Sequence, residues 1–333
     1  MYRSDPDGGP DANKMDRLLQ DFFKGDVRAL SRIITRVENR ASDSLDILRQ
    51  LFPHTGKSQI IGITGSPGAG KSSLVDRLAM AYRKQEKTLG IIAVDPSSPY
   101  TGGAILGDRI RMQSQGIDPG IYIRSMATRG HLGGLSAATA DVVTVLDAVG
   151  KDPIIVETVG VGQDEIDIVK LADVSVVVLV PGMGDDIQAL KAGIMEIGDI
   201  FVINKADRPG VEKMERAVQA VLSLAHRPDM WDPPIVRTVA TQGEGIDELV
   251  QAIDRCYEYF QNSETRTQKR KEAEQQRLMK LLEERLIAAA VQQVFPNGEL
   301  GKIVTEIAER RKDPYSVVEQ IIDNLRFQRL KTS

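Results

Sequence analysis

A glycine-rich run between residues 65 and 73 has the residue types and spacing of a phosphate-binding loop. It matches the pattern GxxxxGKS and follows the apolar stretch 59–64. Glycines let the backbone turn with its N–H groups inward, so that these groups and the N-terminus of a following helix can hold phosphate oxygens. Lys71 is expected to reach the β- and γ-phosphates, and the Ser72 hydroxyl to ligate Mg²⁺. The expected nucleotide-binding residues of this loop are Gly65, Ser66, Pro67, Gly68, Ala69, Gly70, Lys71, Ser72 and Ser73.

A second run, Asn204-Lys205-Ala206-Asp207, indicates which base the nucleotide carries. It follows the apolar segment 200–203 at the C-terminal end of a predicted strand, where ligands bind in doubly wound sheets. The Asp207 carboxylate can accept from N1–H and the 2-amino group of guanine, a pair of donors that adenine lacks. Asn204 is expected to tie this loop to the phosphate-binding loop, and the stem of Lys205 to pack on the base. Asp in such a run also caps helices, but its place after a buried strand favours GTP over ATP. The expected backbone donors to guanine O6 are those of Val239, Ala240 and Thr241.

Three carboxylates are candidate magnesium-binding and water-orienting groups. Asp95 follows the second predicted strand, Asp108 lies in a Gly-rich loop, and Glu157 ends the fourth predicted strand. Carboxylate oxygens there can hold Mg²⁺ directly or through its waters. A turn before proline and a helix N-cap are the alternative roles of Asp95 and Asp108. The N–H of Gly160 is expected to sense the γ-phosphate. Small Ras-like GTPases carry Asp at the position of Glu157, and the residue that positions the attacking water stays open.

The composition is that of an ordinary globular protein and excludes several function classes. Of the 333 residues, 41% are hydrophobic and 27% are charged. Aromatic residues make up only 5% and the net charge is −4, which argues against a nucleic-acid-binding surface. The densest apolar runs have strand length, far short of a membrane span. Cys256 is the single cysteine and forms no internal disulfide; together with the absence of a secretory signal, this predicts a cytoplasmic location.

Apolar periodicity divides the chain into a tail and three segments. Residues 1–13, rich in Asp, Gly and Pro, are expected to form a flexible tail. Residues 14–57 repeat apolar positions at helical spacing and predict an N-terminal helical extension. In 58–262, strand-length apolar runs alternate with helical stretches. This predicts an α/β fold of the P-loop NTPase type, a doubly wound, mainly parallel sheet flanked by helices. The expected strands are 60–64, 89–94, 121–124, 153–157, 174–180, 200–203 and 235–239.

The last segment, 263–333, is predicted to be helical. An apolar stripe, here called the C-terminal stripe, follows one face of a long helix that ends near residue 296. We expect this segment to be a homodimerisation arm, because a long appended helical hairpin often finds its partner in another protomer. Packing on its own domain is the alternative. The C-terminal stripe consists of Leu278, Leu281, Leu282, Leu286, Ala289, Ala290 and Val294.

Together these motifs resemble those of the MeaB/ArgK family of GTPases, chaperones associated with methylmalonyl-CoA mutase. Beyond the runs above, the resemblance rests on the Gly-rich loop with Asp108 and Arg111, on Arg-Gly-His-Leu-Gly-Gly at 129–134, and on Glu-Thr-Val-Gly-Val-Gly-Gln at 157–163. It covers nearly the whole chain from about residue 14 and leaves out the short head before it.

The resemblance implies a homodimeric GTPase that binds an adenosylcobalamin-dependent acyl-CoA mutase. Nucleotide binding and hydrolysis would gate delivery of intact cofactor and help release the damaged form, and the mutase would accelerate hydrolysis. Segment 182–191 matches a further mobile loop that couples nucleotide state to the mutase; its residues alone indicate a strand-to-helix connection with a Gly hinge. The resemblance gives phosphate and metal roles to Lys71 and Ser72, magnesium and water roles to Asp95, Asp108 and Glu157, and the guanine role to Asp207.

Two other function classes fit parts of the sequence. A P-loop kinase of a small molecule or protein would need an acceptor pocket and a catalytic base, and the run at 204–207 counts against it. A nucleotide-dependent targeting or metal-insertion protein is the second alternative. Against it, His54, His131 and His226 are far apart in the sequence, and no basic amphipathic anchor is present.

Overall fold

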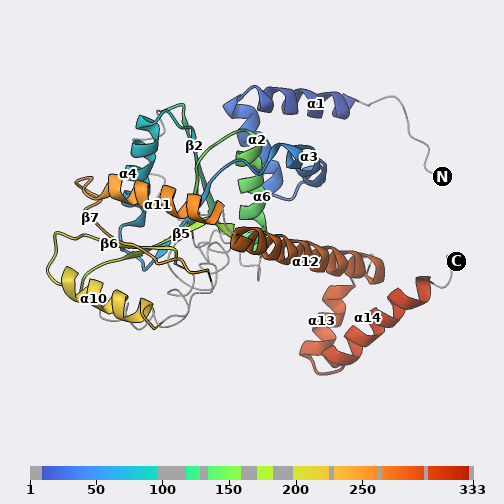
Figure 1. The fold of residues 1–333 in the computed structure, drawn as a ribbon. Helices are drawn as coiled ribbons and strands as arrows, with labels where there is room; N and C mark the ends of the chain where they lie inside the picture. The colour runs from blue at the N-terminus through green and yellow to red at the C-terminus, as the bar shows by residue number, and fades with distance from the viewer. Residues whose placement is uncertain are drawn as a thin grey trace. The chain divides into compact units, whose positions relative to one another are not determined.

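The computed structural model describes residues 10–95, 118–127, 134–158, 171–182, 198–224, 229–261, 264–295 and 299–329. The chain forms two compact units, residues 1–268 and 269–333 (Figure 1). The strands are β1 (Ile60–Gly65), β2 (Leu89–Asp95), β3 (Ile121–Ala127), β4 (Ile154–Glu157), β5 (Val174–Leu179), β6 (Ile200–Asn204) and β7 (Ile235–Thr238). The helices are α1 (Pro10–Phe23), α2 (Val27–Glu38), α3 (Ser44–Leu51), η1 (Phe52–His54), α4 (Lys71–Lys84), α6 (Gly134–Ala148), α10 (Val211–Leu222), α11 (Ile246–Gln261), α12 (Glu264–Val294), α13 (Leu300–Ala308) and α14 (Pro314–Arg329).

The first unit is built on one seven-stranded sheet in the order β3-β2-β4-β1-β5-β6-β7, and every pair of these strands is parallel. This confirms the predicted doubly wound α/β fold. The largest difference from the prediction is at β3, which continues to Ala127, three residues beyond the expected end. The reason is its pairing with β2, which runs without interruption from Leu89↔Ile121 to Asp95↔Ala127.

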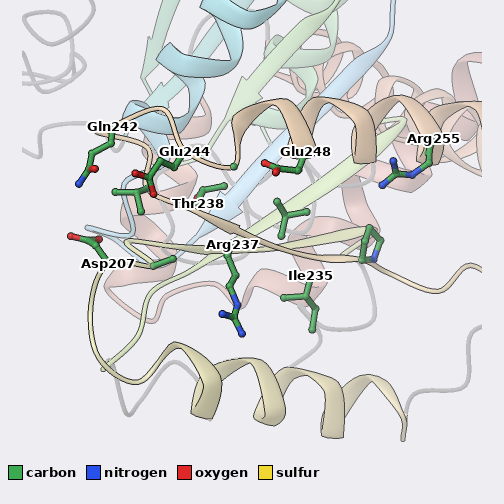
Figure 2. A pocket seen from close by; sticks show the side chains of 13 residues that line it. Asp207, Ile235, Arg237, Thr238, Gln242, Glu244, Glu248 and Arg255 are labelled. Atoms are coloured by element: carbon green, nitrogen blue, oxygen red, sulfur yellow. The ribbon is translucent and has the colours of Figure 1, made fainter.

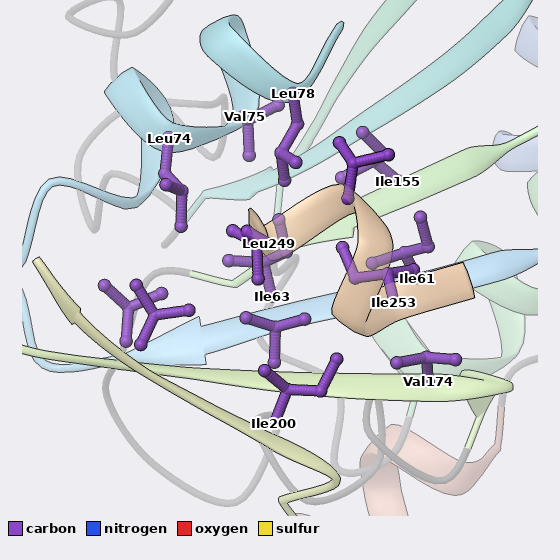
Figure 3. Packing of buried hydrophobic residues seen from close by; sticks show 14 of the residues in the cluster. Ile61, Ile63, Leu74, Val75, Leu78, Ile155, Val174, Ile200, Leu249 and Ile253 are labelled. Carbon is purple, nitrogen blue, oxygen red and sulfur yellow. The ribbon is translucent and has the colours of Figure 1, made fainter. Parts of the chain in front are cut away.

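The inner strands are largely apolar because helices cover both faces of the sheet. All residues of β4, β5 and β6 are buried. On one face, β1 and β5 pack against α4 and α11, with Ile63, Leu74 and Leu249 in the same cluster (Figure 3). The opposite face is covered by α6 with α1 to α3 over β2 and β4, and by α10 over β5 and β6.

A buried carboxylate of α6 holds the link between the N-terminal helices and β1. Asp147, at the end of α6, accepts from the backbone N–H of Gly56 at 2.5 Å and of Ser58 at 3.0 Å, and from the Ser58 hydroxyl at 2.8 Å. A second tie is the ion pair between Glu38 on α2 and Arg124 on β3. The residues just before β1 are therefore held by α6, and α2 is held by β3.

The second unit carries α12 from residue 269 onward, with α13 and α14. Along α12 the C-terminal stripe is exposed at Leu278, Leu282 and Leu286, which are 65%, 46% and 61% exposed. Its members Leu281, Ala290 and Val294 are partly buried. Val317 of α14 is buried, as is Phe295 after α12. The dimerisation role of this segment and the domain boundaries given above stay predictions. Among the described residues, no helix is long and apolar enough to cross a membrane.

Candidate functional site: a nucleotide-binding edge of the sheet

The phosphate-binding loop lies between β1 and α4, and two of its glycines are pressed against neighbouring strands. Gly65 has a φ of 142°, and a Cβ atom there would overlap the carbonyl oxygen of Val178 on β5. Gly70, the N-cap of α4, has a φ of 88°, and a Cβ there would lie 2.5 Å from Asn204 Nδ2. Positive φ and the lack of space both exclude larger residues. The loop is therefore fitted to β5 and β6.

Lys71 begins α4 and turns its ammonium group back over the loop. The residue is only 6% exposed. Its Nζ donates to the carbonyl oxygens of Gly65 at 2.7 Å and Ser66 at 3.1 Å. The charge thus lies beside the N-terminus of α4, where an entering triphosphate meets both the ammonium group and the positive end of the helix dipole.

Ser72 and Glu157 meet next to the loop. The Ser72 hydroxyl donates to Glu157 Oε1 at 2.7 Å. Glu157 ends β4 and is 7% exposed, and it lies in register with Ile63 of β1. A hydroxyl and a carboxylate are hard oxygen donors, the type that Mg²⁺ prefers. The pair therefore fits the predicted magnesium-binding role.

The remaining predicted ligands are only partly described. β2 lies beside β4 with Ala93 opposite Glu157, so β2 ends at Asp95 on the same edge of the sheet. The Asp95 side chain lies outside the described part of the chain, as do Asp108 and Gly160. Among the described residues, no group of three His, Cys, Asp or Glu side chains is placed to hold a metal ion. Of the predicted magnesium ligands, the structure therefore describes the pair from α4 and β4, Ser72 and Glu157.

Asn204, at the end of β6, links the phosphate side of the site to the base side. Its Nδ2 donates to Ala69 O at 2.8 Å, and its Oδ1 accepts from Thr238 Oγ1 and Ala240 N, both at 3.1 Å. Asn204 is 2% exposed, and all three partners are buried as well. A single amide side chain thus joins the phosphate-binding loop, the end of β7 and the loop that follows β7.

Lys205 and Asp207 follow Asn204 in the same turn. Lys205 has a φ of 58°, and its Nζ donates to Gly68 O at 2.7 Å, so its stem crosses from the turn after β6 to the phosphate-binding loop. Asp207 lies at one end of a pocket of about 650 Å³ that follows the edge strand β7 (Figure 2). Arg255 of α11 lies at the other end of that pocket.

The loop after β7 presents fewer free donors than its sequence suggests. The Val239 N–H donates to Glu244 O at 3.1 Å, and the Ala240 N–H donates to Asn204 Oδ1. Of the three predicted donors to guanine O6, only the Thr241 N–H has no acceptor within the described part of the protein. This narrows the predicted contact to Thr241, which is exposed.

Arg77 is a residue of this site that the sequence motifs did not reveal. From α4 its Nε donates to Ala240 O at 2.9 Å and its Nη2 to Thr241 O at 2.7 Å. The only sequence signal is its position six residues after Lys71 on the same helix. Beside it, burial raises the pKa of the Asp76 carboxyl to about 6, against the opposing effect of the Arg77 charge.

A parallel sheet with a GxxxxGKS loop after β1 and an Asn-Lys-x-Asp turn after β6 defines a P-loop GTPase. Comparison with known proteins then gives the family. The family model for "Methylmalonyl Co-A mutase-associated GTPase MeaB" matches residues 30–294, so the chain belongs to the MeaB family. This confirms the resemblance found in the sequence.

Individual relatives agree with this assignment. A putative GTPase of Pyrococcus abyssi is 48% identical over 93% of this chain and 97% of its own length. GTPase ArgK of Escherichia coli is 36% identical over 73% of this chain and 74% of its own length. A crystal structure described as an LAO/AO transport system kinase superposes with a TM-score of 0.66 over 94% of this chain and 98% of its own, at 24% identity, which shows the shared fold. The chain is therefore a GTPase.

Proposed function

We propose that this GTPase binds an adenosylcobalamin-dependent acyl-CoA mutase of the methylmalonyl-CoA mutase type, and that its nucleotide state gates loading of the cofactor and protects or reactivates the mutase. The proposal of a mutase as the binding partner is supported by the match of residues 30–294 to a family described as mutase-associated. Segment 182–191 is the proposed coupling loop, and of it the structure describes only Gly182, with a φ of 95°.

In this proposal the chain's own residues hold the two ends of GTP. Lys71 and the N-terminus of α4 bind the β- and γ-phosphates, while Asp207 accepts from the guanine edge. Ser72 and Glu157, 2.7 Å apart, hold Mg²⁺ together with Asp95 and Asp108. Bound there, Mg²⁺ would neutralise charge that develops on the phosphate oxygens. The Gly160 N–H senses the γ-phosphate.

The guanine assignment is tested at Asp207. In Asp207→Asn one acceptor oxygen becomes an NH₂ donor, so GTP binding should weaken strongly. Binding of xanthosine triphosphate should improve, because its 2-carbonyl accepts from the new donor. Competition titrations of GTP, ATP and xanthosine triphosphate measure this exchange. Asp232→Asn, an exposed Asp before β7, is the matched control and should keep the preference of the wild type. An unchanged preference in Asp207→Asn contradicts the assignment.

The partner is tested with the full chain and purified acyl-CoA mutases. With a non-hydrolysable GTP analogue the two proteins should associate, and the mutase should accelerate GTP hydrolysis. Binding linkage requires that the mutase shift nucleotide affinity by the same factor by which nucleotide shifts mutase affinity. If no candidate mutase binds or changes the hydrolysis rate, the chaperone role is wrong, whereas the GTPase activity stands on the family assignment.

A further inference from the structure

The guanidinium group of Arg77 hydrogen-bonds from α4 to the base loop, defined here as residues 239–241. Its two donors bind successive carbonyl oxygens, Ala240 O at 2.9 Å and Thr241 O at 2.7 Å. Two parallel N–H donors of one planar group fix the orientation of their acceptors better than a single bond does. Arg77 therefore sets the planes of two consecutive peptide groups in that loop.

One of these peptide groups contains the donor left for guanine. Ala240 C=O and Thr241 N–H belong to the same peptide unit, which is planar, so its C=O and N–H point in opposite directions. A bond that holds Ala240 O toward α4 consequently turns the Thr241 N–H away from α4. Within the described structure this is also the N–H of the base loop without a protein acceptor, because those of Val239 and Ala240 donate to Glu244 O and Asn204 Oδ1.

We propose that Arg77 is a positioning residue for base recognition: it orients and polarises the Thr241 N–H as the donor to the 6-oxo group of the purine. The inference rests on the proposed guanine-binding role of this edge of the sheet. It adds Arg77 as the residue that orients a backbone donor toward the base. A cation bound to the carbonyl end of a peptide also withdraws charge from its N–H, which makes that N–H a stronger donor. The ligand class is a 6-oxopurine nucleotide, whatever stands at position 2.

The position of Arg77 on α4 gives it this role without contact to the nucleotide. Lys71 opens the helix at the phosphates, and six residues at about 1.5 Å each place Arg77 about 9 Å further along the axis. The buried residues Leu74, Val75 and Leu78 anchor the same helix to the sheet. The phosphate-binding end and the support of the base loop therefore move as one rigid element.

The test compares Arg77→Met with the wild type by titrating GTP, inosine triphosphate and 6-thio-GTP. Met keeps an apolar stem and removes both donors. We expect GTP and inosine triphosphate, which share the 6-oxo group, to bind about tenfold more weakly to the variant. For 6-thio-GTP, whose sulfur is a poor acceptor, the loss should be under threefold. Lys84→Met, an exposed cation on the same helix, should bind all three like the wild type.

Equal losses for all three nucleotides would mean that Arg77 is a general support of the fold, and no loss would mean that it has no part in binding; either result overturns the proposal. Arg77→Lys covers the case of a poorly folded Met variant. Because lysine can still donate to one carbonyl, its loss for GTP should be intermediate and should again shrink for 6-thio-GTP. A wild type that binds ATP and GTP equally would instead remove the guanine assignment itself, so the two failures are distinguishable.

Discussion

Asn204 should be worth several kilocalories per mole to the folded protein, because its amide serves three buried partners. Asn204→Ala removes the bonds to Ala69 O, Thr238 Oγ1 and Ala240 N. Asn204, Ala69, Thr238 and Ala240 are 2%, 1%, 1% and 2% exposed, so water does not readily replace the lost amide. At about 1 kcal/mol or more for each buried group left without a partner, the free energy of unfolding should fall by about 3 to 5 kcal/mol.

A double-mutant cycle isolates one of these bonds. Thr238→Val keeps the shape of the side chain and removes only the hydroxyl that donates to Asn204 Oδ1 at 3.1 Å. Alone it should cost about 1 kcal/mol, but in the Asn204→Ala background it should cost nothing, because the acceptor is already gone. Thr35→Val, which removes an exposed hydroxyl on α2, should change stability by less than about 0.5 kcal/mol.

Urea unfolding followed by tryptophan fluorescence measures the cycle, because the tryptophan lies in the same compact unit, residues 1–268, as Asn204 and Thr238. Trp231 is the single tryptophan of the chain, and its indole N–H donates to Asp199 O at 2.8 Å, at the start of β6. Equal costs of Thr238→Val in both backgrounds would refute the argument that Asn204 is the shared acceptor. A loss of less than about 1 kcal/mol in Asn204→Ala would refute the claim that these groups are sealed from water.

Three further outcomes follow from the structure. Gly70→Ala should weaken GTP binding by more than about tenfold in a calorimetric titration, because the new Cβ would lie 2.5 Å from Asn204 Nδ2. The control variant is Gly150→Ala, where φ is also positive, at 82°, but the space is open, and it should bind GTP normally. Equal binding by the two variants would contradict the close-packing argument. Asp76→Asn should raise the free energy of unfolding at pH 8 by about 1 to 3 kcal/mol, and the gain should fade between pH 6 and pH 4. The reason is that burial raises the pKa of this carboxyl from 3.8 to about 6, so the folded protein disfavours its ionised form; a gain independent of pH in urea titrations would contradict this cause. Truncation after Gln261 should give a monomer by light scattering if the exposed C-terminal stripe joins two copies of the chain, and an unchanged oligomeric mass would exclude that role.

The sheet was predictable because strand-length apolar runs alternate with helical stretches along residues 58–262. The order of the strands was not specified by those runs, since it depends on crossovers between distant segments. Strand ends were predicted less well where pairing prolongs a strand past its apolar run, as at Ser125 to Ala127 on β3. Asp147, which holds residues 56 to 58 from the end of α6, illustrates the same limit: its partners lie about ninety positions away in the sequence.

The residues of the candidate site also differ in how well the sequence predicts them. Residues expected to contact a ligand were predicted, whereas a residue that supports the base loop was not. Lys71, Ser72 and Asp207 were predicted from the sequence because binding of phosphate, magnesium and guanine would each require a particular donor or acceptor at a fixed spacing. The support of the base loop demands only that two carbonyl oxygens be held, and many side chains on many elements can do that. Arg77 reaches its acceptors across 163 and 164 positions of sequence, so no local pattern marks it. Supporting residues of this kind are therefore found from hydrogen bonds in the folded chain.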